Sequence, residues 1–170
     1  MPTDQVLNHE THSDRPPTPV DRAFQLGYIV AYQLMRTYWR VRHPVTHGAV
    51  VAIWNQGEVL LVRNSYVSFY SSPGGYLNRD EDGRHAAVRE LAEEVGVHVT
   101  PDQLTLALDV THPWEHKQDH VQIYELTLPE RPRVNVDHRE VVDAAWFTPE
   151  RALKLQLFPP LRTVIERRLT

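Results

Sequence analysis

Three glutamates near the middle of the chain have the type and the spacing to bind a divalent cation. Glu90, Glu93 and Glu94 lie three and four residues apart, so a helix would place their carboxylates on one face. Like charges at that spacing repel each other, and a divalent cation would remove this cost. Mg²⁺ and Mn²⁺ prefer such carboxylate oxygens. The alternative interpretation is a solvated acidic face that follows a glycine turn.

Neighbouring residues are suited to orient these carboxylates. Arg89 lies four residues before Glu93 and can hold that side chain in place. Glu81 stands just before the predicted helix, where it can reach the same site or stabilise the helix N-terminus. Gly74 and Gly75 would let the preceding backbone turn tightly and approach a ligand.

A helix from Gly83 to Val95 is the element that must position the glutamates. Ala87, Leu91 and Val95 lie four residues apart and form an apolar stripe that can pack on a sheet. The glutamates then lie on a different face from the stripe. The residues suited to cap the two ends of this helix are Asp82 and Gly96.

The rest of the chain mixes strands with short helices. The apolar segments 49–54 and 59–62, joined by Asn55-Gln56-Gly57, predict a hairpin. Alternating strands and helices favour a mixed-sheet α/β domain with helices on its faces. The other predicted elements are an extended segment at 66–72, strands at 104–110, 121–128 and 141–147, and short helices at 149–155 and 160–169.

The N-terminal part is predicted to lie outside this domain. Residues 1–20 are polar and proline-containing and predict a mobile tail, residues 21–45 a helix, and residues 46–170 the main domain. Asp21 is suited to cap the helix, and Pro44 to end it. The helix either packs on its own domain or a second subunit, or lies at a membrane interface with its arginines at phosphate level. Its apolar residues at helical spacing are Phe24, Tyr28, Ala31, Met35 and Trp39.

Composition limits the classes of function. The chain has 170 residues, of which 41% are apolar and 24% charged, which is typical of a globular domain. A net charge of −4 argues against a surface built to hold DNA or RNA. Cysteine is absent, so disulfides, cysteine-based zinc sites and thiol nucleophiles are excluded, and a cytoplasmic location fits. No segment reaches the roughly 20 apolar residues of a membrane span.

The spacing of the charged segment resembles the signature of the Nudix hydrolases, the MutT-like family. The pattern is Gly75, five residues, Glu81, seven residues, Arg89-Glu90-Leu91, one residue, Glu93-Glu94, one residue, Gly96-Val97. The resemblance extends over about residues 47–169, through Val59–Arg63, Pro73-Gly74-Gly75, Glu140-Val141 and Ala145-Trp146-Phe147. It implies the family's α/β/α sandwich with a mixed sheet, plus an N-terminal helical extension. Two residues depart from the common pattern, Ser72 and Asp80.

The resemblance also implies an activity. Nudix enzymes hydrolyse a diphosphate bond in a nucleoside diphosphate linked to another moiety, with Mg²⁺ or Mn²⁺ and water attack on phosphorus. Carried onto this sequence, Arg89 would orient carboxylates and Gly75 would supply backbone for the substrate or the turn. The implied metal ligands are Glu90, Glu94, Glu93 and Glu81.

The general base and the substrate contacts are less specified. Glu90 and Glu93 are catalytic candidates within the signature, and Glu140 is the candidate that we select outside it, from a set that also holds Glu115, Asp119 and Asp143. Candidates for phosphate and base recognition are Arg63, Tyr70, Trp114 and Gly75, selected from a set that also holds Tyr66 and Phe69. The spacing of His112, His116 and His120 would suggest a metal site on a helix, but Pro113 predicts a loop there.

The sequence leaves the substrate and two other functions open. ADP-ribose, a nucleoside triphosphate, a sugar nucleotide or a dinucleoside polyphosphate would fit the same signature. The first alternative is a catalytically silent nucleotide sensor, against which the full set of glutamates argues. The second is an RNA-end hydrolase, which the lack of a basic tract disfavours. The expected partners are a small diphosphate substrate and a second copy of the chain in a homodimer.

Overall fold

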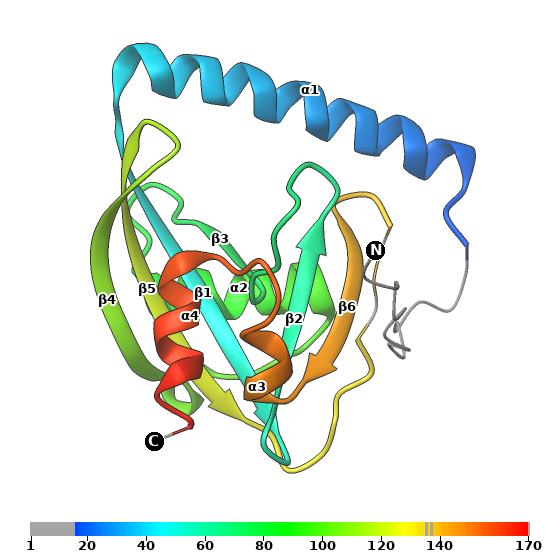
Figure 1. Cartoon of the computed structure of the whole chain (residues 1–170), viewed down its shortest axis with the longest axis vertical. Helices are drawn as coiled ribbons and strands as arrows, with labels where there is room; N and C mark the ends of the chain where they lie inside the picture. The colour runs from blue at the N-terminus through cyan, green and yellow to red at the C-terminus, as the bar shows by residue number, and fades with distance from the viewer. Residues whose placement is uncertain (1–15, 135, 137, 170) are drawn as a thin grey trace, which may run out of the picture.

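A single mixed sheet organises the domain. The computed structural model describes residues 16–134, 136 and 138–169 (Figure 1). Strands β4, β5, β1, β2 and β6 lie side by side in this order, and β3 pairs with β1. β1 runs parallel to β5, whereas the other pairs are antiparallel. The strands are β1 (Val45–Asn55), β2 (Glu58–Asn64), β3 (Gly74–Tyr76), β4 (Thr105–Trp114), β5 (Lys117–Thr127) and β6 (Val141–Phe147).

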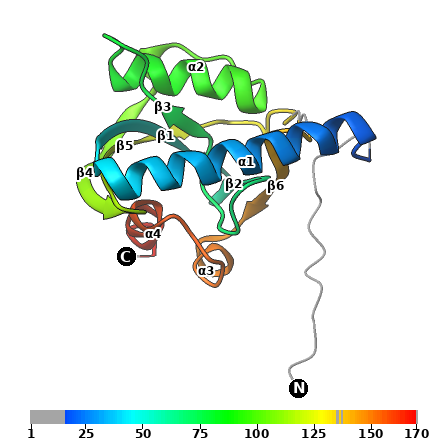
Figure 2. The ribbon, with the colours of Figure 1, turned by 90° about the horizontal axis from the view of Figure 1, so that it is seen from above.

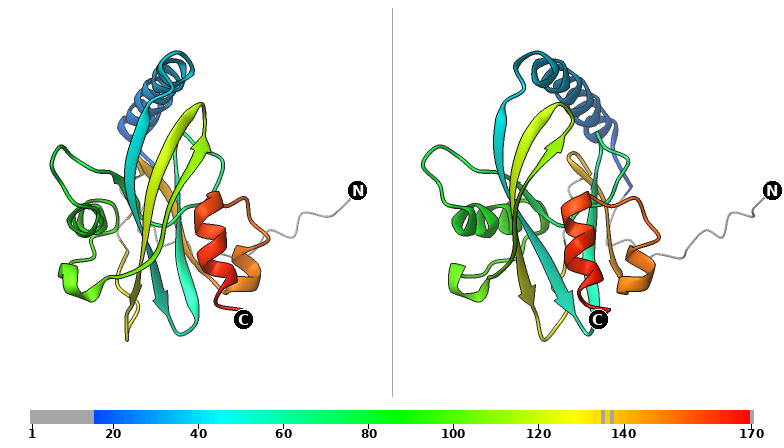
Figure 3. Two further views of the ribbon diagram at one scale, coloured as in Figure 1. Left: turned by 90° about the vertical axis from the view of Figure 1, so that its left-hand side faces the viewer. Right: turned by 60° about the vertical axis from the view of Figure 1, so that its left-hand side comes forward.

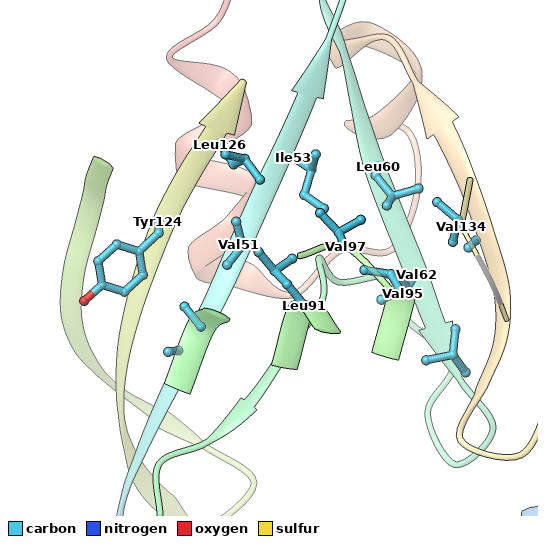
Figure 4. Close-up of a cluster of buried hydrophobic side chains, with 14 of the residues drawn as sticks. Val51, Ile53, Leu60, Val62, Leu91, Val95, Val97, Tyr124, Leu126 and Val134 are labelled. Atoms are coloured by element: carbon cyan, nitrogen blue, oxygen red, sulfur yellow. The ribbon is translucent and has the colours of Figure 1, made fainter. Parts of the chain in front are cut away.

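Helix α2 (Gly83–Val95) covers one face of the sheet. Alternate residues of a strand point to opposite faces, and Ala49, Val51 and Ile53 of β1 point toward this helix. They form a fully buried core with Leu91 and Val95 of α2 (Figure 4). The predicted helix is therefore confirmed with the bounds expected from its caps.

Two short helices cover the opposite face. Helices α3 (Pro149–Ala152) and α4 (Pro159–Glu166) pack on Val50, Ala52 and Trp54, the alternate residues of β1. Figures 2 and 3 show the resulting three layers, with α2 on one side of the sheet and α3 and α4 on the other. The expected α/β/α sandwich is confirmed.

Helix α1 (Pro19–Arg42) precedes the sandwich and crosses one end of the sheet (Figure 1). It begins two residues before the predicted start because Thr18, rather than Asp21, is its N-cap. Asp21 instead completes a capping box with Thr18. The predicted tail falls largely on residues 1–15, outside the described residues.

The segment around the three histidines is a hairpin, which corrects the predicted loop. β4 continues through Pro113 to Trp114, and β5 already begins at Lys117. The proline is tolerated because β4 is an edge strand of the sheet. The tight turn is made by Glu115 and His116, which both adopt positive φ angles of 45° and 70°.

The segment before β3 also differs from the expectation. The predicted extended segment at 66–72 consists instead of turns and bends. An isolated bridge joins Ser71 to Val62 of β2, and another joins Tyr70 to Leu157, between α3 and α4. The segment contributes several side chains to the cavity described below. Within the described residues, no helix is both long and apolar enough to cross a membrane.

Candidate active site

Local structure at α2 places the three glutamates beside a cavity. The carboxylate of Asp82 accepts hydrogen bonds from the amides of Arg84 and His85, and Gly96 ends the helix with φ 69°. The buried stripe of α2 fixes the rotation of the helix about its axis. Its glutamates consequently line a cavity of about 470 Å³ at the end of the sheet that α1 crosses.

Many parts of the chain meet at this cavity. They are α1, β1, β2, the 66–78 segment, α2, the β4–β5 hairpin, the segment before β6, and Phe158 just before α4. Sequence-predicted residues from separate parts of the chain line this cavity. They are Gly75, Arg89, Glu90, Glu93, Glu94, Trp114, Glu115, Asp119 and Glu140.

Glu94 is the most enclosed of these carboxylates. Its Oε2 accepts a hydrogen bond of 2.8 Å from the backbone amide of Gly74. Burial raises the pKa of Glu94 to about 8, although the Gly74 amide opposes the shift. The negative charges of Glu90 and Glu140 raise the pKa further. A carboxylate in such a position gains from a bound cation that offsets its charge.

Glu90 lies against the glycine turn. A Cβ atom at Gly75 would stand 2.4 Å from Oε1 of Glu90, so a glycine is required for the carboxylate to lie where it does. Burial raises the pKa of Glu90, whereas the nearby Arg89 guanidinium lowers it. This close approach gives Gly75 a role that its place in the sequence signature alone did not specify.

Arg89 joins the carboxylates into one network. Its guanidinium donates to Glu90 at 2.6 Å and to Glu93 at 3.3 Å. It also makes two bonds of 3.0 Å to the carboxylate of Glu81. Glu81 further accepts from the Asn78 amide at 2.8 Å and does not line the cavity. The structure thus connects Glu81 to the cavity carboxylates through Arg89.

The carboxylates fit a hard divalent cation in their chemistry. Glu90, Glu93, Glu94 and Glu140 supply oxygen donors to one cavity, which suits Mg²⁺ or Mn²⁺. Among residues 16–134, 136 and 138–169, no three acidic or histidine side chains form a preassembled metal-binding group. Arg89 instead holds oxygens of two of these glutamates, Glu90 and Glu93, through its own hydrogen bonds.

Glu140 has the best position among the candidates for a general base. It lines the cavity, and its Oε1 accepts a hydrogen bond of 2.8 Å from the hydroxyl of Tyr66. Glu115 and Asp119 also line the cavity, but each carboxylate is paired with a cation. Glu115 pairs with Arg36 at 3.2 Å, and Asp119 with Lys117 at 2.8 Å. Asp143 accepts from Tyr70 at 2.6 Å and lies outside the cavity.

Two predicted substrate contacts do not reach the cavity. The guanidinium of Arg63 lies 5.9 Å from the ring centre of Tyr70, and both side chains lie outside the cavity lining. Tyr70 packs instead on Phe147 at 5.8 Å, in the core beneath α3 and α4. The structure therefore does not bring Arg63 and Tyr70 to the remaining site residues.

One half of the cavity is aromatic and was only partly predictable from the sequence. Trp114 was predicted there, whereas Tyr32, Trp39, Tyr76 and Phe158 were not. Trp114 lies edge-to-face with Phe69 at 5.5 Å and with Phe158 at 5.6 Å. Ser72 is 3% exposed and lines the same cavity, and among the described residues its hydroxyl has no hydrogen-bond partner. This serine is one of the two residues that depart from the common pattern of the signature. The remaining aromatic lining residues are Tyr32, Trp39, Tyr66 and Tyr76.

Comparison with known proteins decides the family. A model described as the NUDIX domain matches residues 44–167. The chain belongs to the Nudix family. α1 lies before the matched Nudix domain, whereas all the glutamates named above lie within it.

Two curated relatives share parts of the Nudix domain. A Xenopus laevis protein named nucleoside diphosphate-linked moiety X motif 6 is 30% identical over 108 residues, which cover 62% of this chain and 50% of that protein. A Bacillus subtilis protein named putative 8-oxo-dGTP diphosphatase is 40% identical over 52 residues, which cover 30% of this chain and 35% of that protein. The chain thus spans half or less of the length of these curated relatives.

Solved structures support the Nudix fold. The MutT protein from Methanosarcina mazei Go1 superposes with a TM-score of 0.63 at 23% identity, and the match covers 75% of this chain and 95% of that one. A similarity at this level of identity shows the fold alone. The mixed-sheet sandwich is therefore that of MutT-like proteins.

Proposed function

We propose that the protein is a metal-dependent hydrolase that cleaves a diphosphate bond in a nucleoside diphosphate linked to another moiety. The observation that carries this proposal is the convergence of Glu90, Glu93, Glu94 and Glu140 on one cavity beside the Gly74-Gly75 turn. Membership of the Nudix family supports the same reaction class.

Each charged residue then has a separate task. Glu90, Glu93 and Glu94 would hold Mg²⁺ or Mn²⁺, which when bound supplies positive charge to offset that of the phosphates. Arg89 orients these carboxylates, and Glu81 fixes Arg89 in turn. Glu81 therefore acts through Arg89 in this proposal rather than as a direct ligand.

Glu140 is the proposed general base. Its carboxylate takes a proton from a water molecule as the water oxygen attacks one phosphorus atom. A bond forms between water and phosphorus, and the bond from that phosphorus to the bridging oxygen breaks. The hydroxyl of Tyr66 holds Glu140 in the orientation needed to accept the proton. Positioning and electrostatic stabilisation supply most of the catalysis in such phosphoryl chemistry.

The aromatic half of the cavity supports a planar group as the non-phosphate end of the substrate. Trp114 and Phe69 offer ring surfaces on which a nucleobase can stack. The Ser72 hydroxyl can bond a polar edge of that group. The names of the two relatives, which refer to a nucleoside diphosphate and to 8-oxo-dGTP, support a nucleotide-type substrate.

The experiment is a hydrolysis assay over a panel of diphosphates. ADP-ribose, sugar nucleotides, dinucleoside polyphosphates and canonical and oxidised nucleoside triphosphates are each incubated with Mg²⁺, with Mn²⁺ or with chelator. Glu94→Gln tests the site, and Glu130→Gln, the same change at an exposed position outside the cavity, is the matched control. We expect metal-dependent turnover that Glu94→Gln abolishes and Glu130→Gln retains.

A catalytically silent nucleotide sensor is the second candidate. Its support is the aromatic half of the cavity, which can hold a ligand without cleaving it. Calorimetric binding of a panel compound together with absent turnover by the folded, metal-loaded wild type would favour the sensor over the hydrolase.

We also propose that the protein works in the cytoplasm and forms a homodimer. The support for the homodimer is the outward face of α1, which exposes several large apolar side chains to solvent. These are Leu26, Val30, Leu34, Tyr38 and Val41.

A further inference from the structure

We infer that helix α1, which precedes the matched Nudix domain, is a positioning element of the active site. It holds two strained backbone segments that carry cavity residues, and through the first of them, together with Tyr66, it orients Glu140. This inference rests on the proposed function for its catalytic consequence. The contacts that carry it involve described residues at several points along α1.

The first strained segment leads directly to Glu140. His138 has a φ of 64°, a left-handed conformation that non-glycine residues rarely adopt. Nε2 of Gln25 donates a hydrogen bond of 2.6 Å to the carbonyl oxygen of His138. The next residue, Arg139, pairs with the buried Asp21 at 3.4 Å. The N-terminal part of α1 therefore fixes the backbone on which Glu140 stands.

The middle of α1 acts on Glu140 through a tyrosine. The ring of Tyr32 lies 4.9 Å from the ring of Tyr66, and the ring of Tyr28 lies 6.2 Å from it. The hydroxyl of Tyr66 donates to Glu140 at 2.8 Å and accepts from Asn64 at 2.9 Å. The helix thus supports both the backbone of Glu140 and the group that orients its carboxylate.

The second strained segment is the β4–β5 turn. Glu115 and His116 both have positive φ angles, a conformation that such turns normally give to glycine or asparagine. The Glu115 carboxylate accepts from the Tyr32 hydroxyl and pairs with Arg36 at 3.2 Å. Nδ1 of His43, the residue after α1, lies 3.0 Å from the carbonyl oxygen of His116. These bonds compensate for a turn of unfavourable sequence.

This turn places cavity-lining residues on both of its sides, among them Trp114 before it and Lys117 after it. The Lys117 amino group, with a side chain only 1% exposed, lies 5.0 Å from the ring centre of Trp39. Trp39 is the one apolar residue of α1 that is fully enclosed. The C-terminal part of α1 is therefore fixed to the same hairpin by a cation–π contact.

A purely structural role for α1 fits these observations less well. A helix that served to enlarge the core would turn its apolar residues inward, but Leu26, Val30 and Leu34 are exposed. The inward face instead carries polar and aromatic side chains that contact the two strained segments and Tyr66. The aliphatic side chains of α1 thus lie on its outward face, whereas its inward face contacts segments that carry cavity residues.

The test compares equal substitutions on one helix of the full chain. Gln25→Ala and the isosteric Gln25→Glu both remove the donor to His138. Gln33→Ala and Gln33→Glu are matched controls, because Gln33 is exposed and hydrogen-bonds to its helix neighbour Arg36. We expect both Gln25 variants to lower kcat about tenfold with KM within about twofold. The Gln33 variants should match the wild type.

Hydrogen exchange provides a measurement that does not need turnover. Backbone amides of residues 139–143 should exchange faster in both Gln25 variants than in the wild type and the Gln33 variants, at unchanged melting temperature. Faster exchange without a loss of kcat in an active enzyme would overturn the inference, as would unchanged exchange. If the wild type cleaves no panel compound, the proposed function fails separately, and faster exchange would still support the positioning role of α1.

Discussion

At the scale of single residues, the proposed site depends on how closely its carboxylates approach the Gly74-Gly75 turn. Gly75 is the sharpest example, because its missing side chain leaves the space that the Glu90 carboxylate occupies. The neighbour that a new Cβ would meet is the flexible end of a side chain. The protein can therefore fold around a larger residue while the carboxylate is displaced.

Gly75→Ala is expected to lower kcat/KM about a hundredfold, because a displaced carboxylate no longer has its catalytic geometry. Gly27→Ala is the control, since a Cβ at that exposed position of α1 meets nothing within 4 Å. Steady-state kinetics and circular dichroism check the pair. Equal activity of the two variants would contradict the role given to Gly75.

Glu94 predicts a pH dependence of stability in the metal-free protein. Its pKa is raised to about 8 by burial, from an ordinary value near 4.5. Between these values the folded protein holds a proton that the unfolded chain releases, so rising pH favours unfolding. Across this range the free energy of unfolding falls by up to about 1.4 kcal/mol for each pH unit. The stabilisation from the protonated Glu94 is fully present below about pH 4.5 and is lost above about pH 8.

Urea titrations from pH 5 to pH 9 in chelator measure this effect. We expect the free energy of unfolding to fall more steeply with pH in the wild type than in Glu94→Gln, which has no ionisable group at that position. Identical pH profiles for the two proteins would show that Glu94 does not carry the raised pKa.

At the scale of elements, α2 was predictable and the β4–β5 hairpin was not. The caps Asp82 and Gly96 and the buried stripe are local signals, and each agrees with the others in the structure. The hairpin has a Glu115-His116 turn of atypical sequence and a proline within its first strand, so local rules favour a loop. The turn is stabilised by α1, which no local signal reveals.

The candidate site likewise contains residues that the sequence could predict and residues that it could not. The glutamates of α2 and the glycine turn follow from spacing within one short segment of the sequence. Tyr32 and Trp39 reach the cavity from a helix far away in the sequence, so no spacing rule could connect them with Glu140. Conversely, Arg63 and Tyr70 are near the signature in sequence but lie outside the cavity lining.

The N-cap of α2 allows a direct test of the local signals that define this helix. Asp82→Ala removes the acceptor for the amides of Arg84 and His85 and should lower the melting temperature by about 3 °C. Asp82→Asn keeps a capping oxygen and should lower it less. Differential scanning calorimetry ranks the three proteins, and an order in which the asparagine variant is the least stable would contradict the capping role.

At the scale of the whole molecule, the outward face of α1 predicts self-association. Its exposed apolar side chains make it a surface that a second copy can bury. We expect sedimentation velocity to detect a dimer at micromolar concentration and Leu34→Glu to shift it toward the monomer. Gln33→Glu, which adds a charge at the neighbouring exposed position, should remain a dimer. A wild type that stays monomeric at high concentration would contradict the homodimer proposal.

Hydrolysis of a diphosphate in this cavity by water attack on phosphorus can be tested directly. The measurement is the mass of the products formed in ¹⁸O-labelled water with Mg²⁺ or Mn²⁺, over the panel of diphosphates. We expect one ¹⁸O atom in a phosphate group of a product, and no product with chelator or with Glu94→Gln. Absence of labelled product from every compound, with the wild type folded and metal bound, would contradict it.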